Sequence, residues 1–185
     1  MTTYTARLAL PVSKRDHIRG EATIPVTLVE YGDYECPHSG EAFALIENIR
    51  TYLQDRLRFV FRHFPMTQTH LHAQYAAEAA EAAGTQDKFW EMHTNIFTHQ
   101  HALNDADLMQ YATSLHLDVA RFRRELAVHQ HAVRVREDFI SGIRSGVNAT
   151  PTFFINQARY DGPRDFDGLL TAIEKANRIG HVRTA

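Results

Sequence analysis

The residues best suited to chemistry lie in YGDYECPHSGEAF, residues 31–43, which contains the single cysteine of this 185-residue chain. Pro37 follows Cys36, and proline suits the first position of a helix, where its missing N–H would have no intrahelical partner. Free backbone N–H groups and the macrodipole at a helix N-terminus stabilise negative charge. His38 can add a positive or hydrogen-bonding neighbour. These features favour the thiolate form of Cys36, which is the nucleophilic form of a cysteine.

A lone cysteine is commonly a small buried apolar side chain rather than a nucleophile. The order Cys-Pro-His at an expected junction between a strand and a helix outweighs that interpretation, and we read Cys36 as a reactive thiol. Ser39 stands where a second cysteine would complete a Cys-X-X-Cys motif. With one cysteine the chain forms no internal disulfide, so its stability must come from packing.

Two strands and a helix are expected to position this segment. VTLVEYG, residues 26–32, is rich in β-branched residues and reads as a buried strand. After the cysteine, apolar residues from Phe43 to Leu53 recur at helical spacing. LRFVFRHFP, residues 57–65, is predicted to be a second strand whose phenylalanines lie in the core. A strand, a helix and a strand in this order predict a βαβ unit with parallel strands.

The remaining segments surround this unit. Residues 15–25, RDHIRGEATIP, read as a polar loop, and residues 69–140 contain four stretches with helical patterns. Residues 150–156 are predicted to be a strand, followed by a turn into a short strand and a closing helix over 165–179. We therefore expect a single α/β domain over 1–185. Its parts are an N-terminal βαβ half (16–65), a helical insertion (66–146) and a C-terminal ββα half (147–180).

Composition limits the possible partners. Twenty basic and twenty-two acidic side chains give a net charge of −2, which argues against nucleic acid as a partner. No stretch approaches the ~20 apolar residues of a membrane span. The short apolar run 8–12 does not resemble a secretory leader, so the sequence favours a cytoplasmic protein without membrane insertion. Oligomeric state stays open.

Two segments together resemble the DsbA-type branch of the thioredoxin superfamily. VTLVEYGDYECPHS and GVNATPTFFIN match it in type, spacing and order, with an expected helical insertion between them. The resemblance covers residues from about Asp16 to Ile179. It implies a thioredoxin-like fold, a central mixed sheet built from βαβ and ββα halves, and a thiol–disulfide oxidoreductase.

The resemblance also implies roles for individual residues. Cys36 matches the nucleophile, and Pro37 and His38 match the dipeptide that tunes it. Glu30 matches a buried acid beneath the sulfur that handles protons. Pro151 matches a cis-proline, and the backbone of Thr150 before it could pair with an extended substrate. Tyr34, with the neighbouring aromatic residues, is expected on an apolar rim that receives a peptide.

Ser39 departs from the family pattern, because oxidases of this family carry a resolving cysteine there. A serine can support the thiolate by a hydrogen bond but cannot expel a mixed disulfide. We therefore expect no autonomous dithiol oxidase. An outside thiol such as glutathione, or a cysteine of the substrate, would act as co-substrate in reduction or isomerisation. No bound cofactor is expected, and the partners would be protein or small-molecule thiols and disulfides.

Two other functions stay open. Cys36 could be a peroxidatic or sensor thiol that cycles through sulfenic acid. The domain could also be a degenerate binding module, since related domains occur appended to membrane transporters.

The twelve histidines include pairs at 70/72, 99/101 and 129/131, which we placed on helices. Helical residues two apart do not share a face, so we expect surface and capping histidines and no metal site.

Overall fold

The computed structural model describes residues 6–182, so residues 1–5 and 183–185 of the expected domain lie outside the described residues. The chain divides into two compact units. The sheet unit comprises the parts of the chain up to Tyr31, Glu41–Arg62 and Ser141 onwards. The helical unit comprises Gly32–Gly40 and His63–Ile140, and it therefore contains the cysteine segment.

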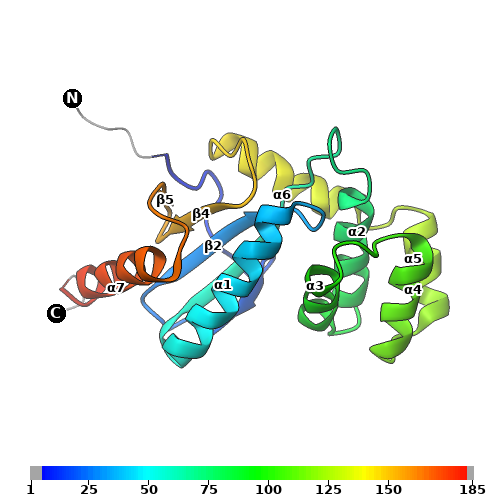
Figure 1. The fold of residues 1–185 in the computed structure, drawn as a ribbon, viewed down its shortest axis with the longest axis horizontal. Coiled ribbons are helices and arrows are strands. Elements are labelled where there is room, and N and C mark those ends of the chain that lie inside the picture. The colour runs from blue at the N-terminus through cyan, green and yellow to red at the C-terminus, as the bar shows by residue number, and fades with distance from the viewer. Residues whose placement is uncertain (1–5, 183–185) are drawn as a thin grey trace. The chain divides into compact units, whose positions relative to one another are not determined.

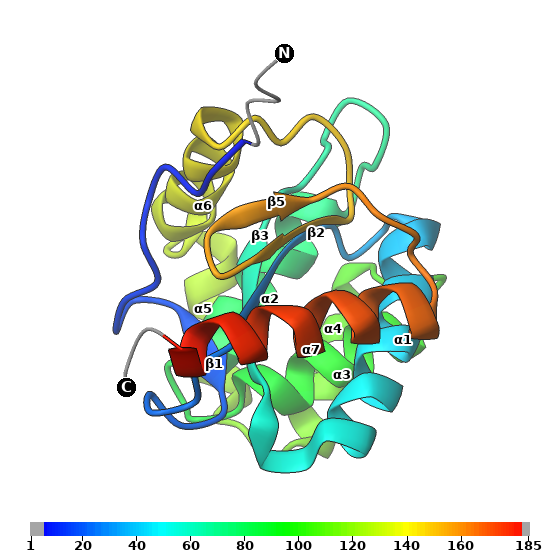
Figure 2. The same ribbon diagram turned by 90° about the vertical axis from the view of Figure 1, so that its left-hand side faces the viewer.

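The sheet unit is built on five strands (Figures 1 and 2). They are β1 (His17–Arg19), β2 (Thr27–Gly32), β3 (Arg58–His63), β4 (Thr152–Ile155) and β5 (Ala158–Tyr160), in the order β1-β3-β2-β4-β5. The Arg58 N–H donates to the Val26 carbonyl and the Phe64 N–H to the Gly32 carbonyl, so β2 and β3 run in parallel, as expected. The other pairings for which the register is known, β1 with β3, β2 with β4 and β4 with β5, are antiparallel. The sheet is therefore mixed.

Two helices belong largely to the sheet unit. Helix α1 (Pro37–Leu53) begins in the helical unit, enters the sheet unit at Glu41 and ends in a short 3-10 turn, η1 (Gln54–Arg56). Helix α7 (Phe166–Val182) packs on β4 and buries Leu169 and Ile173. The rings of Tyr52 on α1 and Phe166 meet edge to face with centroids 5.8 Å apart.

The helical unit contains most of the segment between β3 and β4, up to Ile140 (Figure 1). Its helices are α2 (Ala73–Gly84), α3 (Phe89–Thr98), α4 (Asp105–Ser114), α5 (Val119–Ala127) and most of α6 (Ala132–Arg144). The alanine-rich α2 packs against α3, α4 and α5, because its small side chains allow close approach. The Asn104 and Asp118 side chains cap α4 and α5 by accepting hydrogen bonds from backbone N–H groups.

Two sequence expectations about elements were wrong. Residues 17–19 form strand β1, although the polar segment 15–25 read as a loop. This short strand is specified by its pairing with the backbone of β3, not by its own side chains. The last of the four helical stretches is two helices, α5 and α6, because His129 adopts a left-handed φ of 52° between them. The two helices share one amphipathic pattern, so periodicity alone did not separate them.

Strand β3 carries a buried charge between apolar neighbours. Phe59 and Phe61 are buried as expected, but the Arg62 side chain is also fully buried. Its guanidinium donates to both carboxylate oxygens of Asp16 at 2.8 and 3.2 Å and to the hydroxyl of Tyr31 at 2.9 Å. It also donates to the carbonyls of residues 10 and 11. The segment before β1 is therefore held to the sheet by a hydrogen-bonded ion pair.

Candidate functional site

Cys36 precedes the first residue of α1, with Pro37 in the first helical position as expected. The Cys36 carbonyl accepts from the N–H groups of Ser39 at 3.0 Å and Gly40 at 3.1 Å, so the residue forms the start of the helix. Free N–H groups at this end favour a negative charge on a nearby sulfur. Cys36 is 6% exposed. A reacting sulfur must therefore approach over a small area.

Asp33 organises the turn before the cysteine. Its side chain is buried, and Oδ1 accepts from the Glu35 N–H at 2.8 Å. Oδ2 accepts from the Met66 N–H at 2.8 Å and lies 2.8 Å from His70 Nδ1. The Asp33 N–H in turn donates to Ser39 Oγ at 3.3 Å. One carboxylate thus joins the cysteine turn to the segment between β3 and α2.

A second carboxylate makes a similar contact two residues later. Glu35 accepts from the His72 N–H at 2.6 Å through Oε2 and lies 3.0 Å from His72 Nδ1 through Oε1. Burial acts to raise the pKa of Glu35, but the hydrogen bonds from His72 and the charges of His72 and His70 outweigh it. The net shift of the Glu35 pKa is downward. The two carboxylates therefore fasten the turn to two histidines with the same spacing in the sequence.

Pro37 and His38 are exposed, whereas Ser39 is completely buried. We expected the Ser39 hydroxyl to support the thiolate. The structure gives its oxygen a structural partner, the Asp33 N–H. Ser39 therefore helps to close the turn around Cys36.

Tyr34 does not lie on an exposed rim, contrary to our expectation. It is 1% exposed, and its hydroxyl is 3.0 Å from His93 Nδ1. Its ring packs against those of Phe97, His93 and His63, with centroids 4.8–5.8 Å apart. A buried ring cannot form the surface that receives a substrate. Tyr34 anchors the cysteine segment in the core of the helical unit.

Glu30 lies on β2 in the sheet unit, six residues before Cys36 in the sequence. It is 1% exposed, and within residues 6–182 its Oε1 has no hydrogen-bond partner. Desolvation by burial raises the pKa of Glu30 to about 8. The carboxyl group can therefore take up or release a proton near neutral pH.

Thr150 and Pro151, the residues expected to bind substrate through their backbone, also lie in the sheet unit just before β4. The peptide bond between them is cis. Both residues are buried. The Thr152 hydroxyl donates to the Ala149 carbonyl at 2.7 Å and closes this turn.

The three histidine pairs are not on helices, contrary to our expectation. His70 and His72 precede α2, His99 and His101 follow α3, and His129 and His131 lie around the α5–α6 turn. Four of these side chains contact carboxylates: His70 with Asp33, His72 with Glu35, His129 with Glu78 and His131 with Glu125. Turns allow side chains two apart to reach separate partners, so the helical argument did not apply to them.

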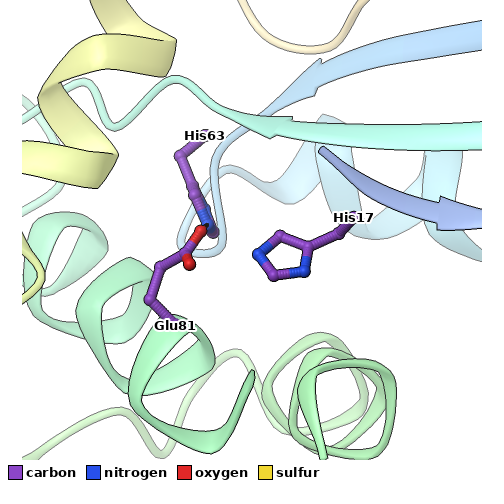
Figure 3. A group of neighbouring side chains, drawn as sticks. All are labelled: His17, His63 and Glu81. Atoms are coloured by element: carbon purple, nitrogen blue, oxygen red, sulfur yellow. Dashed lines mark hydrogen bonds and ion pairs between the residues drawn. The ribbon is translucent and has the colours of Figure 1, made fainter. Parts of the chain in front are cut away.

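Another buried histidine–carboxylate pair lies in the helical unit. His63 Nε2 at the end of β3 is 2.9 Å from Glu81 Oε1 on α2, and Figure 3 shows the two side chains pointing toward each other. His17, drawn with them, belongs to β1 of the sheet unit.

Four residues that shape the site were not predicted from the sequence: Asp33, Glu35, His70 and His72. One signal was present: Asp-X-Glu lies before the cysteine, and His-X-His occurs 37 residues later with the same spacing. Nothing in the sequence shows that the two segments meet. The fold brings them together by placing the β3–α2 connection beside the cysteine turn.

The family profile described as thioredoxin matches residues 12–175. BdbD from Bacillus subtilis has a similar structure, with a TM-score of 0.80 and 23% sequence identity, covering 94% of this chain and 99% of BdbD. DsbA1 from Wolbachia pipientis gives a TM-score of 0.81 at 19% identity, covering 96% of this chain and 98% of that one. The thioredoxin-like fold with a helical insertion is confirmed.

The curated relatives are longer proteins. The chain is 47% identical over 170 residues to the Na⁺/H⁺ antiporter NhaA 1 of Salinispora arenicola, covering 91% of this chain and 26% of that protein. It is 42% identical over 165 residues to the Na⁺/H⁺ antiporter NhaA of Herminiimonas arsenicoxydans, covering 89% of this chain and 26% of that protein. The chain thus spans about a quarter of these relatives. Within its described part, none of the helices is long and apolar enough to cross a bilayer. Because the family profile matches residues 12–175, most of its length, the chain belongs to the thioredoxin family.

Proposed function

We propose that this chain carries out thiol–disulfide exchange through one sulfur, that of Cys36. The observation that supports this most directly is the position of the only cysteine of the chain at the N-terminus of α1, next to Pro37. A helix start stabilises the thiolate, and the thiolate is the species that attacks a disulfide.

In the first step, the Cys36 thiolate attacks one sulfur of a substrate disulfide. A new bond forms between Cys36 and that sulfur, and the second substrate sulfur leaves as a thiolate that takes up a proton. In the second step, an outside thiolate attacks the substrate sulfur of this mixed disulfide. Cys36 is released as thiolate, and the outside thiol remains bonded to the substrate sulfur.

The outside thiol supplies what Ser39 lacks, since a hydroxyl cannot form the second sulfur–sulfur bond. With glutathione as this thiol and a protein–glutathione disulfide as substrate, Cys36 takes the glutathionyl sulfur and the second step releases glutathione disulfide, which is deglutathionylation. A disulfide between two protein sulfurs is left bonded to glutathione after the second step, and a second glutathione must attack it to complete reduction. With a cysteine of the substrate itself, the reaction is isomerisation. A reducing thiol pool is needed for the first of these, so a cytoplasmic location is part of the proposal.

Two groups of the sheet unit complete the proposed mechanism. Glu30 is buried with a pKa near 8, so it suits proton exchange with the cysteine as the sulfur changes between thiol and thiolate. The backbone of Thr150, before Pro151, is proposed to pair with an extended segment of the substrate, as in strand addition. His38, exposed beside Cys36, is proposed to favour the thiolate.

The proposal is tested by treating the protein with glutathione disulfide and measuring its mass. We expect one glutathionyl adduct on the wild type, removal of that adduct by reduced glutathione, and no adduct on Cys36→Ser. The matched variant is Ser39→Cys, which should release bound substrate thiol without an outside thiol. A wild type that stays unmodified under these conditions contradicts the proposal.

A second candidate function is a module that regulates or binds a transporter. The observation in its favour is the 41–47% identity to several proteins named as Na⁺/H⁺ antiporters, of which the chain spans about a quarter. This reading predicts that Cys36→Ala leaves antiport unchanged when the chain is tested together with such a transporter. A loss of redox-dependent antiport in the same variant would instead favour a thiol-dependent role.

A further inference from the structure

Gln100 contacts the backbone on both sides of residue 35. It lies in the connection between α3 and α4 and is half-buried. Its Nε2 donates to the carbonyl of Tyr34 at 2.9 Å and to the carbonyl of Cys36 at 2.9 Å. One side-chain amide group therefore uses both of its N–H bonds on the cysteine turn. All of these residues belong to the helical unit.

Gly40 provides independent evidence that this contact is built into the site. Glycine inside a helix is unfavourable compared with alanine, so its place in the first turns of α1 needs a reason. A Cβ atom at residue 40 would overlap with Gln100 Oε1 and lie 2.8 Å from Gln100 Cδ. The absent side chain at residue 40 therefore leaves the space that the Gln100 amide occupies.

We propose that Gln100 is a positioning residue that holds the Cys36 backbone in the conformation needed for exchange. The inference rests on the proposed function, which it deepens by naming a residue outside the Cys-Pro-His-Ser segment. Gln100 does not touch the sulfur in this proposal. It acts through the carbonyls of residues 34 and 36, which fix where the Cys36 Cα lies relative to the start of α1.

The physical argument concerns the entropy of the turn. Asp33 fastens its beginning through Met66 and His70, and the helix fastens its end. Tyr34 and Glu35 contact other residues in the middle through their side chains, whereas Gln100 holds the backbone carbonyls there, where the chain must change from strand to helix. Without it the backbone at Cys36 has more accessible conformers, and fewer of them place the sulfur at the helix N-terminus. A nucleophile loses reactivity when its geometry is not held in place.

The first test compares Gln100→Ala and Gln100→Glu with Gln110→Ala, a change at an exposed glutamine on α4. The reaction of Cys36 with iodoacetamide is followed from pH 5 to 9, together with glutathionylation by glutathione disulfide. Losing one or two ordinary hydrogen bonds should lower the population of the reactive backbone conformation at Cys36, and with it the rate of reaction, about tenfold. We expect that loss in Gln100→Ala, with a changed pH profile, and wild-type behaviour in Gln110→Ala.

Gln100→Glu separates positioning from packing. Glutamate has the size of glutamine, but its carboxylate has no N–H to donate and would face two carbonyl oxygens. We expect it to react at least as slowly as Gln100→Ala. If Gln100→Glu restores the wild-type rate, the side chain only fills space and the inference is overturned.

The second test is a double-mutant cycle with Gly40→Ala, read out as thermal midpoint and iodoacetamide rate. Alone, Gly40→Ala displaces Gln100, so it should lower both quantities. In the Gln100→Ala background the added methyl group meets no amide, and the better helix propensity of alanine should raise the midpoint. Effects of equal sign and size in both backgrounds would show that the two residues act separately, against the inference.

If Gln100→Ala is too unstable to measure, the single variants Gly40→Ala and Gln100→Glu still test the inference, because both perturb the same contact. Failure of the inference differs from failure of the proposed function. If the wild type exchanges rapidly but Gln100→Ala keeps at least half its rate, only the inference fails. If the wild type forms no mixed disulfide, the proposed function itself fails.

Discussion

At the scale of single residues, two groups, Cys36 of the helical unit and Glu30 of the sheet unit, each have a chemistry that depends on where the backbone puts them. Cys36 is a nucleophile candidate because it stands at a helix start, and the same residue in mid-helix would be an ordinary buried thiol. Glu30 is a proton carrier candidate because burial, and not a neighbouring charge, raises its pKa to about 8. Both properties come from position and desolvation rather than from residue type.

The raised pKa of Glu30 predicts how stability depends on pH. The folded-state pKa lies above the ordinary value of 4.5, so the folded protein binds a proton that the unfolded chain has lost between these two pH values. The favourable contribution is complete below pH 4.5 and is lost as the pH rises to about 8. Glu30→Gln cannot ionise, so its stability relative to the wild type should increase over this range and then level off. The gain is at most about 5 kcal/mol.

Urea unfolding from pH 4 to 9 measures the difference in stability between Glu30→Gln and the wild type. The value at the lowest pH serves as the internal control. A difference that stays constant from pH 4 to 9 would show that Glu30 ionises at the same pH in the folded and unfolded protein. In that case it could not serve as the proton carrier of the proposed mechanism.

At the scale of elements, the cysteine turn is held by the segment between β3 and α2. Asp33 and Glu35 reach His70 and His72, and Asp33 also accepts the Met66 N–H. Each contact is of modest strength, since the histidines are partly or largely exposed. Together they order a turn that has no regular secondary structure of its own.

The lowered pKa of Glu35 makes part of this connection sensitive to acid. Its contribution to stability is complete above the ordinary carboxyl pKa of 4.5 and is lost as the pH falls through the lower folded-state value. We expect Glu35→Gln to be less stable than the wild type above pH 5, by under about 1 kcal/mol, with the difference shrinking at lower pH. Thermal unfolding across this range checks it. The exposed Glu21→Gln is the control, and an equal response of both variants would contradict the assignment.

At the scale of the whole molecule, the sheet unit depends on a charge in its interior. Arg62 and Asp16 are both completely buried at their side chains, and Arg62 also holds the carbonyls of residues 10 and 11. An ion pair of this kind adds little when intact, but removing one partner leaves an uncompensated charge in the core. Removing either side chain of this ion pair should therefore destabilise the protein and loosen the N-terminal segment from the sheet.

Asp16→Ala is expected to lower the free energy of unfolding by about 3–5 kcal/mol. Asp161→Ala breaks an ion pair of similar length, Arg159 with Asp161 at 2.8 Å, but Asp161 is 67% exposed. Losing this exposed ion pair should lower the free energy of unfolding by less than about 1 kcal/mol. Urea denaturation of the two variants compares them directly, and equal losses would mean that Arg62 finds water or another acceptor when Asp16 is absent.

Local sequence patterns correctly predicted the start of α1 after Cys36, the βαβ and ββα order and the phenylalanines of the core. These features follow from local rules: proline at a helix start, β-branched runs in strands, and apolar spacing in helices. Where a local pattern was ambiguous the predictions failed, as at β1, whose strand depends on pairing with β3, and at the α5–α6 break.

The surroundings of the cysteine depend on contacts between residues that are far apart in the sequence. Tyr34 is in the core and not on a rim, and Gln100 reaches Cys36 from 64 residues away. Asp33 meets His70 across 37 residues, and Arg62 is buried on Asp16 across 46. Hydrogen bonds and desolvation depend on which groups are neighbours in space, and one-dimensional spacing does not encode that neighbourhood.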